Sequence, residues 1–147
     1  MSWIVPAESD VLTVLSESEL STYRAAATAS GQADPLAPTL AQVVDLVRGY
    51  VGAYKPNTLG LPGTIPQKLL APALDLVAVR VPQRVGVSPK DVRQTAAAQA
   101  VRLLEQVAAG TFNIEEPDSP TTETTSAPRP TIEARHRHFS QRSEEGI

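Results

Sequence analysis

Residues 39–54 read TLAQVVDLVRGYVGAY, and their apolar side chains recur at the spacing of one helix face. The apolar positions are Leu40, Val43, Val44, Val47, Tyr50, Val51 and Tyr54. A spacing of i, i+3, i+4 and i+7 is typical of an amphipathic helix that packs one stripe against a core, and it leaves Asp45 and Arg48 on the other face. Gly49 and Gly52 each cost up to about 1 kcal/mol inside a helix. They indicate either the close approach of another backbone or small residues on a surface face.

Two shorter helices are predicted ahead of this segment, over residues 7–15 and 17–29. Ser16 and Glu19 have the spacing of a capping box, in which the hydroxyl accepts from the third amide and the carboxylate accepts from the first. Gly31 follows at a position where helices commonly end on a left-handed residue. The second helix therefore carries a signal at each of its ends.

A fourth helix is predicted to open at Ile65-Pro66, because proline is tolerated in a first turn, and to continue to Val81 on a periodic apolar pattern. Pro72 marks either the true start of this helix or a kink in it, and Pro82 is expected to end it. Between the third and fourth helices, residues 55–66 are rich in proline and glycine, which indicates a loop.

The last helix is predicted over residues 89–109. Ser88 is its expected N-cap and Pro89 its first residue, and Gly110 is its expected C-terminal cap. The residues that follow, 111–115, alternate apolar and polar side chains in the manner of a short strand.

These signals together predict a mainly α fold: a small bundle of about five helices with a short C-terminal strand and an extended C-terminal arm. Residues 1–116 form the helical domain and residues 117–147 the arm. The arm is rich in proline and threonine and has few apolar side chains, so burial cannot offset the entropy of ordering it. Aromatic residues make up only 4% of the chain, so the core has to be built from Ala, Val and Leu.

The composition argues against several classes of protein. The chain has no cysteine, which excludes disulfides and thiolate metal sites. A net charge of −3 without a cluster of Lys or Arg disfavours free-standing DNA binding. No apolar run approaches the ~20 residues of a membrane span, and the first residues lack the basic and apolar regions of a signal peptide. We expect a soluble protein, made in a cytoplasm and without membrane contact.

The sequence also argues against an enzyme. Its two histidines, His136 and His138, lie between arginines in the arm, where few donors converge on a metal. No Ser-His-Asp set can be assembled within the helical domain, and residues 60–64 lack the lysine of a phosphate loop. Scattered carboxylates are interpreted as solvated: Asp45, Asp75, Asp91 and Glu105. We expect no catalytic, cofactor-binding or metal site.

Three stretches carry a resemblance to a known family. Residues 49–54 read GYVGAY, residues 65–73 read IPQKLLAPA, and residues 97–110 read AAQAVRLLEQVAAG and are followed by Ile114. In this order they resemble the head–tail connector (adaptor, head-completion) proteins of tailed bacteriophages and Mu-like prophages. The resemblance covers residues 8–116.

The resemblance implies a structural virion protein. Copies, twelve by implication, would form a ring at the phage neck that joins the portal protein of the DNA-filled head to the next neck or tail-completion protein. DNA would pass through the lumen without specific binding. The protein would lie at the head–tail junction of the virion, and in the host cytoplasm during assembly. Helices 39–54 and 88–109 are expected in the bundle core, and the loop of residues 55–66 is expected to face the lumen or the tail.

The arm is the expected contact with the portal. Its candidate partner-binding residues are Ile132, Arg135, Arg137, Phe139 and Arg142, of which Ile132 and Phe139 supply the apolar anchors. An alternative is a soluble assembly chaperone or partner-binding adaptor that is not retained in the virion. A small enzyme or DNA-binding module is a third and weaker alternative, because the chain lacks a recognisable site.

Overall fold

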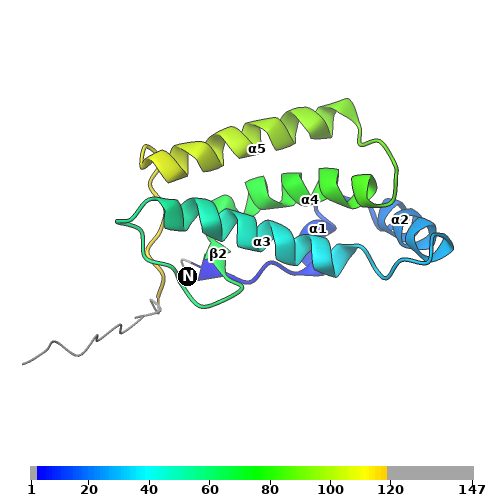
Figure 1. The fold of residues 1–147 in the computed structure, drawn as a ribbon, viewed down its shortest axis with the longest axis horizontal. Coiled ribbons are helices and arrows are strands. Elements are labelled where there is room, and N and C mark those ends of the chain that lie inside the picture. The colour runs from blue at the N-terminus through cyan, green and yellow to red at the C-terminus, as the bar shows by residue number, and fades with distance from the viewer. Residues whose placement is uncertain (1–2, 119–147) are drawn as a thin grey trace, which may run out of the picture.

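A computed structural model describes residues 3–118, and helices account for most of this part of the chain (Figure 1). The elements are β1 (Trp3–Ile4), α1 (Glu8–Val11), α2 (Glu17–Ala29), α3 (Leu36–Ala53), β2 (Ile65–Pro66), a 3₁₀ turn (Gln67–Leu69), α4 (Leu70–Arg84) and α5 (Asp91–Ala109). The predicted mainly α fold, a small bundle of about five helices, is confirmed.

Helix α4 occupies the centre of the bundle. It packs against α3, α5 and α1, and α3 and α5 also pack against each other. Helices α3, α4 and α5 lie side by side along the long axis, and α2 lies at one end (Figure 1). Most residues of α4 are buried, because a helix with three neighbours needs an apolar surface on more than one face. The two helices expected in the core, α3 and α5, flank it and each keep an exposed face.

Pro72 lies near the start of α4, but neither Pro66 nor Pro82 bounds this helix as predicted. Pro66 lies in β2, and the helix begins only at Leu70, after the 3₁₀ turn. Pro72 is the third helical residue, where the backbone N–H has no partner within the helix, so it lies near the true start rather than at a kink. Pro82 does not end the helix as expected. Its missing N–H removes one hydrogen bond in the last turn, and the helix continues to Arg84.

Three other helices also differ from the sequence-based expectation in where they begin or end. The first helix is shorter than residues 7–15, since only Glu8–Val11 is α-helical and turns follow. Helix α3 starts earlier, at Leu36, whose N–H donates to Asp34 Oδ1 at 3.0 Å. Helix α5 starts later, at Asp91, with Lys90 rather than Ser88 as its N-cap. There the side-chain amide of Gln94 donates to the Pro89 carbonyl at 2.9 Å, and residues 88–90 lie outside the helix.

The strand predicted over residues 111–115 is not formed. Both strands of the described part lie elsewhere: β1 and β2 pair antiparallel, with Trp3 opposite Pro66 and Ile4 opposite Ile65. Residues 111–118 instead run from the end of α5 back past β2 (Figure 1). Phe112 and Ile114 are half-buried against the core, so their alternation reflects packing against helices and not pairing with a strand.

The capping box of α2 is confirmed, and its carboxylate also forms ion pairs with residues at the start of α5. Ser16 Oγ accepts from the Glu19 N–H, and Glu19 Oε2 accepts from the Ser16 N–H, each at 3.2 Å. The same carboxylate pairs with Arg93 at 2.8 Å and with Lys90 at 3.2 Å. The Arg93 hydrogen bond is the main cause that lowers the pKa of Glu19 from 4.5 to about 2. One side chain thereby starts α2 and ties it to the start of α5.

We predict that Glu19→Gln removes a pH-dependent part of the stability. Because the pKa of Glu19 is lower in the folded protein, its charge stabilises the fold above pH 4.5, and this contribution is lost as the pH falls through 2. After allowance for solvent screening of this partly exposed pair, the loss is about 1–3 kcal/mol. Glutamine keeps the capping geometry and removes only the charge. Urea unfolding at pH 7, 4.5 and 2.5 measures the difference.

The matched control for this experiment is Glu17→Gln, which removes an exposed carboxylate in the same helical turn. Its free energy of unfolding should keep the wild-type dependence on pH. Equal pH dependence in wild type and Glu19→Gln would contradict the assignment of this stability to the pair with Arg93.

Candidate partner-binding surfaces

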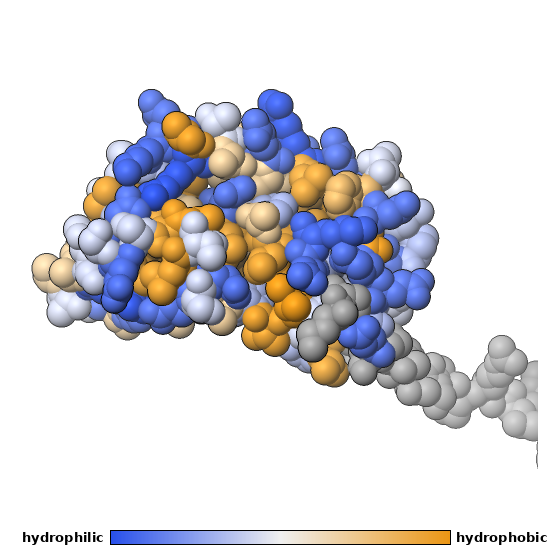
Figure 2. Space-filling model, turned by 180° about the vertical axis from the view of Figure 1, so that it is seen from behind, coloured by the Kyte–Doolittle hydropathy of each residue, from blue (hydrophilic) through white to orange (hydrophobic). Residues whose placement is uncertain are grey.

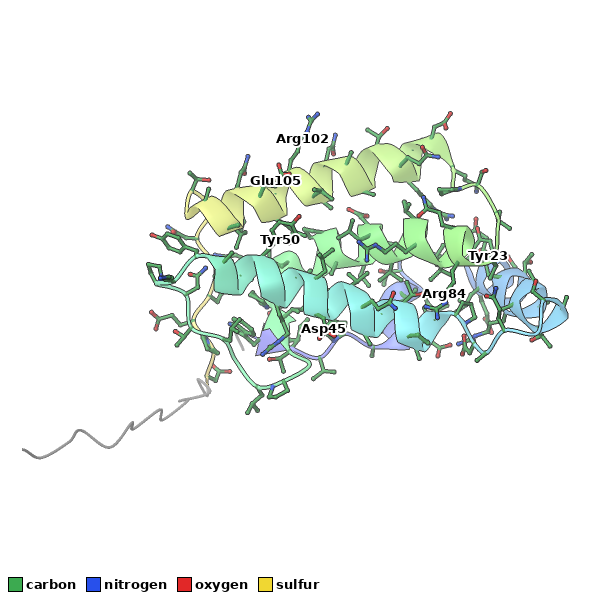
Figure 3. All side chains as sticks on the ribbon, viewed as in Figure 1. Tyr23, Asp45, Tyr50, Arg84, Arg102 and Glu105 are labelled. Atoms are coloured by element: carbon green, nitrogen blue, oxygen red, sulfur yellow. The ribbon has the colours of Figure 1, made fainter. Side chains whose placement is uncertain are left out.

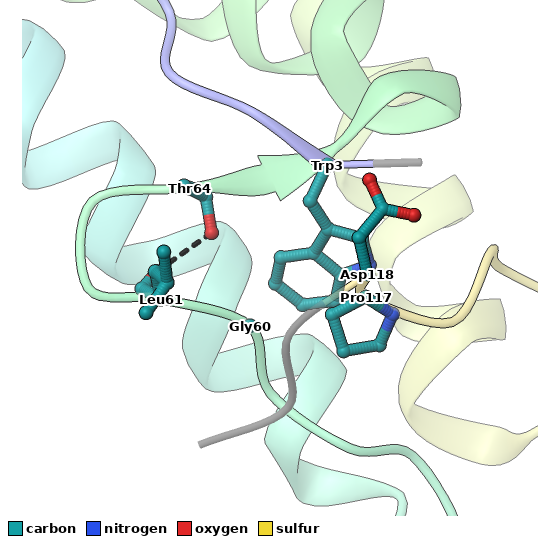
Figure 4. Close-up of a pocket in the computed structure, with 6 residues that line it drawn as sticks. All are labelled: Trp3, Gly60, Leu61, Thr64, Pro117 and Asp118. Carbon is teal, nitrogen blue, oxygen red and sulfur yellow. Dashed lines mark hydrogen bonds between the residues drawn. The ribbon is translucent and has the colours of Figure 1, made fainter. Parts of the chain in front are cut away.

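The first candidate surface is the end of the bundle where the C-terminal segment leaves. The Trp3 indole Nε1 donates to the Glu115 carbonyl at 2.9 Å. A Cβ on Gly60 would lie 2.9 Å from the Trp3 ring and 3.0 Å from Pro117 Cβ, so only glycine allows the ring and the segment to approach this closely. A small cavity of about 110 Å³ remains between the loop and the segment, lined by Trp3, Gly60, Leu61, Thr64, Pro117 and Asp118 (Figure 4).

Arg48 holds the loop that forms one wall of this cavity. Its guanidinium donates to the carbonyls of Leu61 at 2.9 Å, Thr64 at 2.7 Å and Gly60 at 3.1 Å, and it lies 5.9 Å from the centroid of the Trp3 ring. A planar group with five donors can satisfy several carbonyls at once. The sequence places Arg48 on the polar face of its helix, but it does not reveal that this side chain organises the loop and the N-terminal strand.

Glu115 adds a charged contact at the same end of the bundle. Its carboxylate lies 3.8 Å from Lys68 Nζ. An ion pair of this length between partly exposed groups is weak. The Oε2 atom of Glu115 is buried and has no hydrogen-bond partner within the described residues. The position of residues 115–117 is therefore fixed by the Trp3 hydrogen bond and by packing against Gly60 more than by this ion pair.

The second candidate surface is an apolar groove between α3 and α5. It has a volume of about 430 Å³ and is lined by Asp45, Leu46, Gly49, Tyr50, Ala53 and Ala108. Tyr50 lies between the two helices, with Asp45 further along α3 (Figure 3). A Cβ on Gly49 would meet nothing within 4 Å, and one on Gly52 would meet only the Leu59 side chain at ordinary contact distance. Within this chain, the two glycines are small residues on a surface face.

The opposite end of α5 carries exposed apolar side chains. Val92, in its first turn, is 81% exposed, and Val87, in the α4–α5 turn, is 41% exposed. On the rear face of the molecule, apolar side chains are exposed in separate patches with hydrophilic ones around them (Figure 2). The groove is therefore one apolar feature among several on the surface.

The four carboxylates that were predicted to be solvated differ in their burial. Asp45, Asp91 and Glu105 are exposed, whereas Asp75, on the central helix α4, is half-buried and burial raises its pKa. Across residues 3–118, no three His, Asp or Glu side chains lie close enough together to hold a metal ion.

The candidate residues of the arm lie outside the described residues. They are Ile132, Arg135, Arg137, Phe139 and Arg142, and the two histidines, His136 and His138, lie outside as well. The structure describes only the start of the segment that leads to these residues, including Glu115 and Pro117.

The chain matches no protein-family model, no curated protein and no solved structure. None of the helices found between residues 3 and 118 is long and apolar enough to cross a membrane.

We predict that Arg48→Lys destabilises the protein by about 1–3 kcal/mol, because an ammonium cannot serve three carbonyls in the geometry of the guanidinium. Trp3 is the only tryptophan of the chain, so its fluorescence reports directly on this end of the bundle. The emission should shift to the red in the variant.

Arg102→Lys is the control, since Arg102 points away from α5 into solvent (Figure 3). The stability of this control variant should stay within about 0.5 kcal/mol of wild type. Equal effects of the two substitutions would contradict the role given to Arg48.

Proposed function

We propose that this protein is a structural component of a phage neck, a head–tail connector whose copies form a ring between the portal and the tail. The observation that carries the proposal is the fixed exit of the C-terminal segment. Trp3, Gly60 and Glu115 hold the start of this segment against the bundle. An arm that begins at the same point on every copy can bind equivalent sites on a ring-shaped partner.

The rest of the described chain supports this proposal. The bundle is small and helical, and it presents an apolar groove and exposed valines as surface for assembly. The resemblance in residues 49–54, 65–73 and 97–110 falls on the ends of α3 and α5 and on the start of α4, the elements that build the bundle. A net charge of −3 suits a channel for DNA, because weak repulsion from phosphates lets the genome pass.

The location of the protein in assembled particles tests this proposal directly. We expect an antibody against this chain to label tailed particles from the source organism at the head–tail junction in immunogold electron microscopy. Particles without label, with the protein left in the lysate supernatant, would contradict the neck assignment and favour an assembly chaperone or adaptor. The control antibody is raised against a capsid protein of the same particles and should label the heads.

We predict that a chain cut after Asp118 folds but no longer binds the portal. All buried core residues of the described part lie between Val11 and Val107, and the cut keeps both the Trp3–Glu115 hydrogen bond and Pro117. The thermal midpoint should therefore match that of the full chain, while pull-down by purified portal protein is lost. Full portal binding by the truncated chain would contradict the assignment of the arm to this contact.

A pair of variants in the full chain locates the contact within the arm. Ile132→Ser combined with Phe139→Ser should weaken portal binding, because these are the expected apolar anchors. Thr124→Ala combined with Thr125→Ala, in the same arm, is the matched control and should bind as wild type.

A further inference from the structure

Helix α2 lies at one end of the bundle (Figure 1) and makes little apolar contact with it. Of its thirteen residues only Leu20 and Ala27 are buried, and only Leu20 belongs to the continuous apolar core. Tyr23 is half-buried against that core. Helix α4, by contrast, buries nine of its fifteen residues. Elements with few buried apolar contacts open at a lower free energy than the core does.

The Arg24 cluster attaches the middle of α2 to segments on both sides of it in sequence. The Arg24 guanidinium pairs with Glu8 of α1 at 2.9 Å and with Asp34 of the α2–α3 loop at 3.2 Å. Asp34 also accepts from the N–H of Leu36 at 3.0 Å, so it serves the start of α3 with or without Arg24. All three charged side chains are partly exposed. Salt therefore screens their attraction.

The Glu19 cluster attaches the start of α2 to the start of α5. Its ion pairs, with Arg93 at 2.8 Å and with Lys90 at 3.2 Å, reach residues that are distant in sequence. Arg93 also donates to the Val14 carbonyl at 3.3 Å, so it keeps a partner in the bundle without Glu19. Helix α2 is thus held chiefly by one core leucine, one half-buried tyrosine and two clusters of charge.

Both ends of the α2 segment have the properties of a hinge. Residues 16–18 and 28–34 are exposed, whereas Leu15 and Leu36, on either side of this segment, are almost completely buried. Gly31 has a φ of 74°, and a Cβ on it would meet nothing within 4 Å. A hollow of about 370 Å³ beside residues 32–34 leaves room next to this connection. Residues 16–33 can therefore move while the chain on either side stays in the core.

We propose that residues 16–33 form a flap that opens from the bundle as one unit, at a free energy below that of global unfolding, and that the Arg24 and Glu19 clusters keep it closed. Opening takes Leu20 out of the core and exposes the apolar surface that this side chain covers. Because charge holds the flap, ionic strength shifts the fraction of open molecules. This conformational device goes beyond the proposed neck function and does not depend on it.

Native-state hydrogen exchange of the full chain at pH 7, read by mass spectrometry, tests the flap. The protection factors of α2 amides should agree with one another and lie at least about tenfold below those of α4 amides, because α2 opens without global unfolding. Raising NaCl from about 50 mM to about 1 M should lower the α2 protection at least about threefold. Equal protection of α2 and α4 overturns the flap, and protection that does not respond to salt overturns its control by charge.

Two substitutions weaken the clusters one at a time. Arg24→Gln and Glu19→Gln should each lower the protection of α2 amides at least about threefold in low salt. Their difference from wild type should shrink in high salt, where the wild-type clusters are already screened. The matched controls are Arg102→Gln and Glu105→Gln, which remove exposed charges from α5 and should leave α2 protection unchanged. Wild-type protection in both cluster variants overturns the role given to these ion pairs.

A substitution in the core separates opening of the flap from global unfolding. Ile65 is fully buried in β2, at a distance from α2 along the bundle (Figure 1). Ile65→Val should lower the protection of α4 amides at least about threefold. The α2 amides should keep their wild-type protection, because residue 65 stays packed while the flap is open. An equal fall in α2 and α4 would show that α2 opens only with the whole bundle and would overturn the inference.

Discussion

The burial of α4 between α3, α5 and α1 is the constraint on which the rest of the molecule depends. With so few aromatic side chains, the core is filled by Ala, Val and Leu, and Ala73 and Ala100 are among the buried residues. Small side chains let helices approach closely, and close packing makes the bundle intolerant of changes in volume. Because α4 takes the centre, α3 and α5 are left with outward faces, and the groove between them follows from that arrangement.

Two aromatic side chains, Trp3 and Tyr54, lie against glycines at the end of the bundle where the C-terminal segment begins. Trp3 packs on Gly60, and the Tyr54 ring lies so close to Gly110 that a Cβ there would overlap it. Gly110 also has a φ of 79°, which glycine adopts without strain. Large rings seated on glycines fix the ends of α3 and α5 together with the N-terminal strand. The C-terminal segment therefore begins where these rings pack against the backbone.

The parts of the fold that were predictable from sequence depend on neighbours in the chain. The capping box at Ser16 and the glycine at the end of α5 act within one helical turn, so local reading located them correctly. The pairing of Trp3 with Pro66 joins residues far apart in sequence, and no local sequence pattern predicts it. The same holds for the surfaces: the sequence left open whether Gly49 marks a close approach of another backbone or a small surface residue, and the groove also needs Ala108 from another helix. The carbonyls that meet Arg48 likewise come from a loop whose path local patterns do not specify.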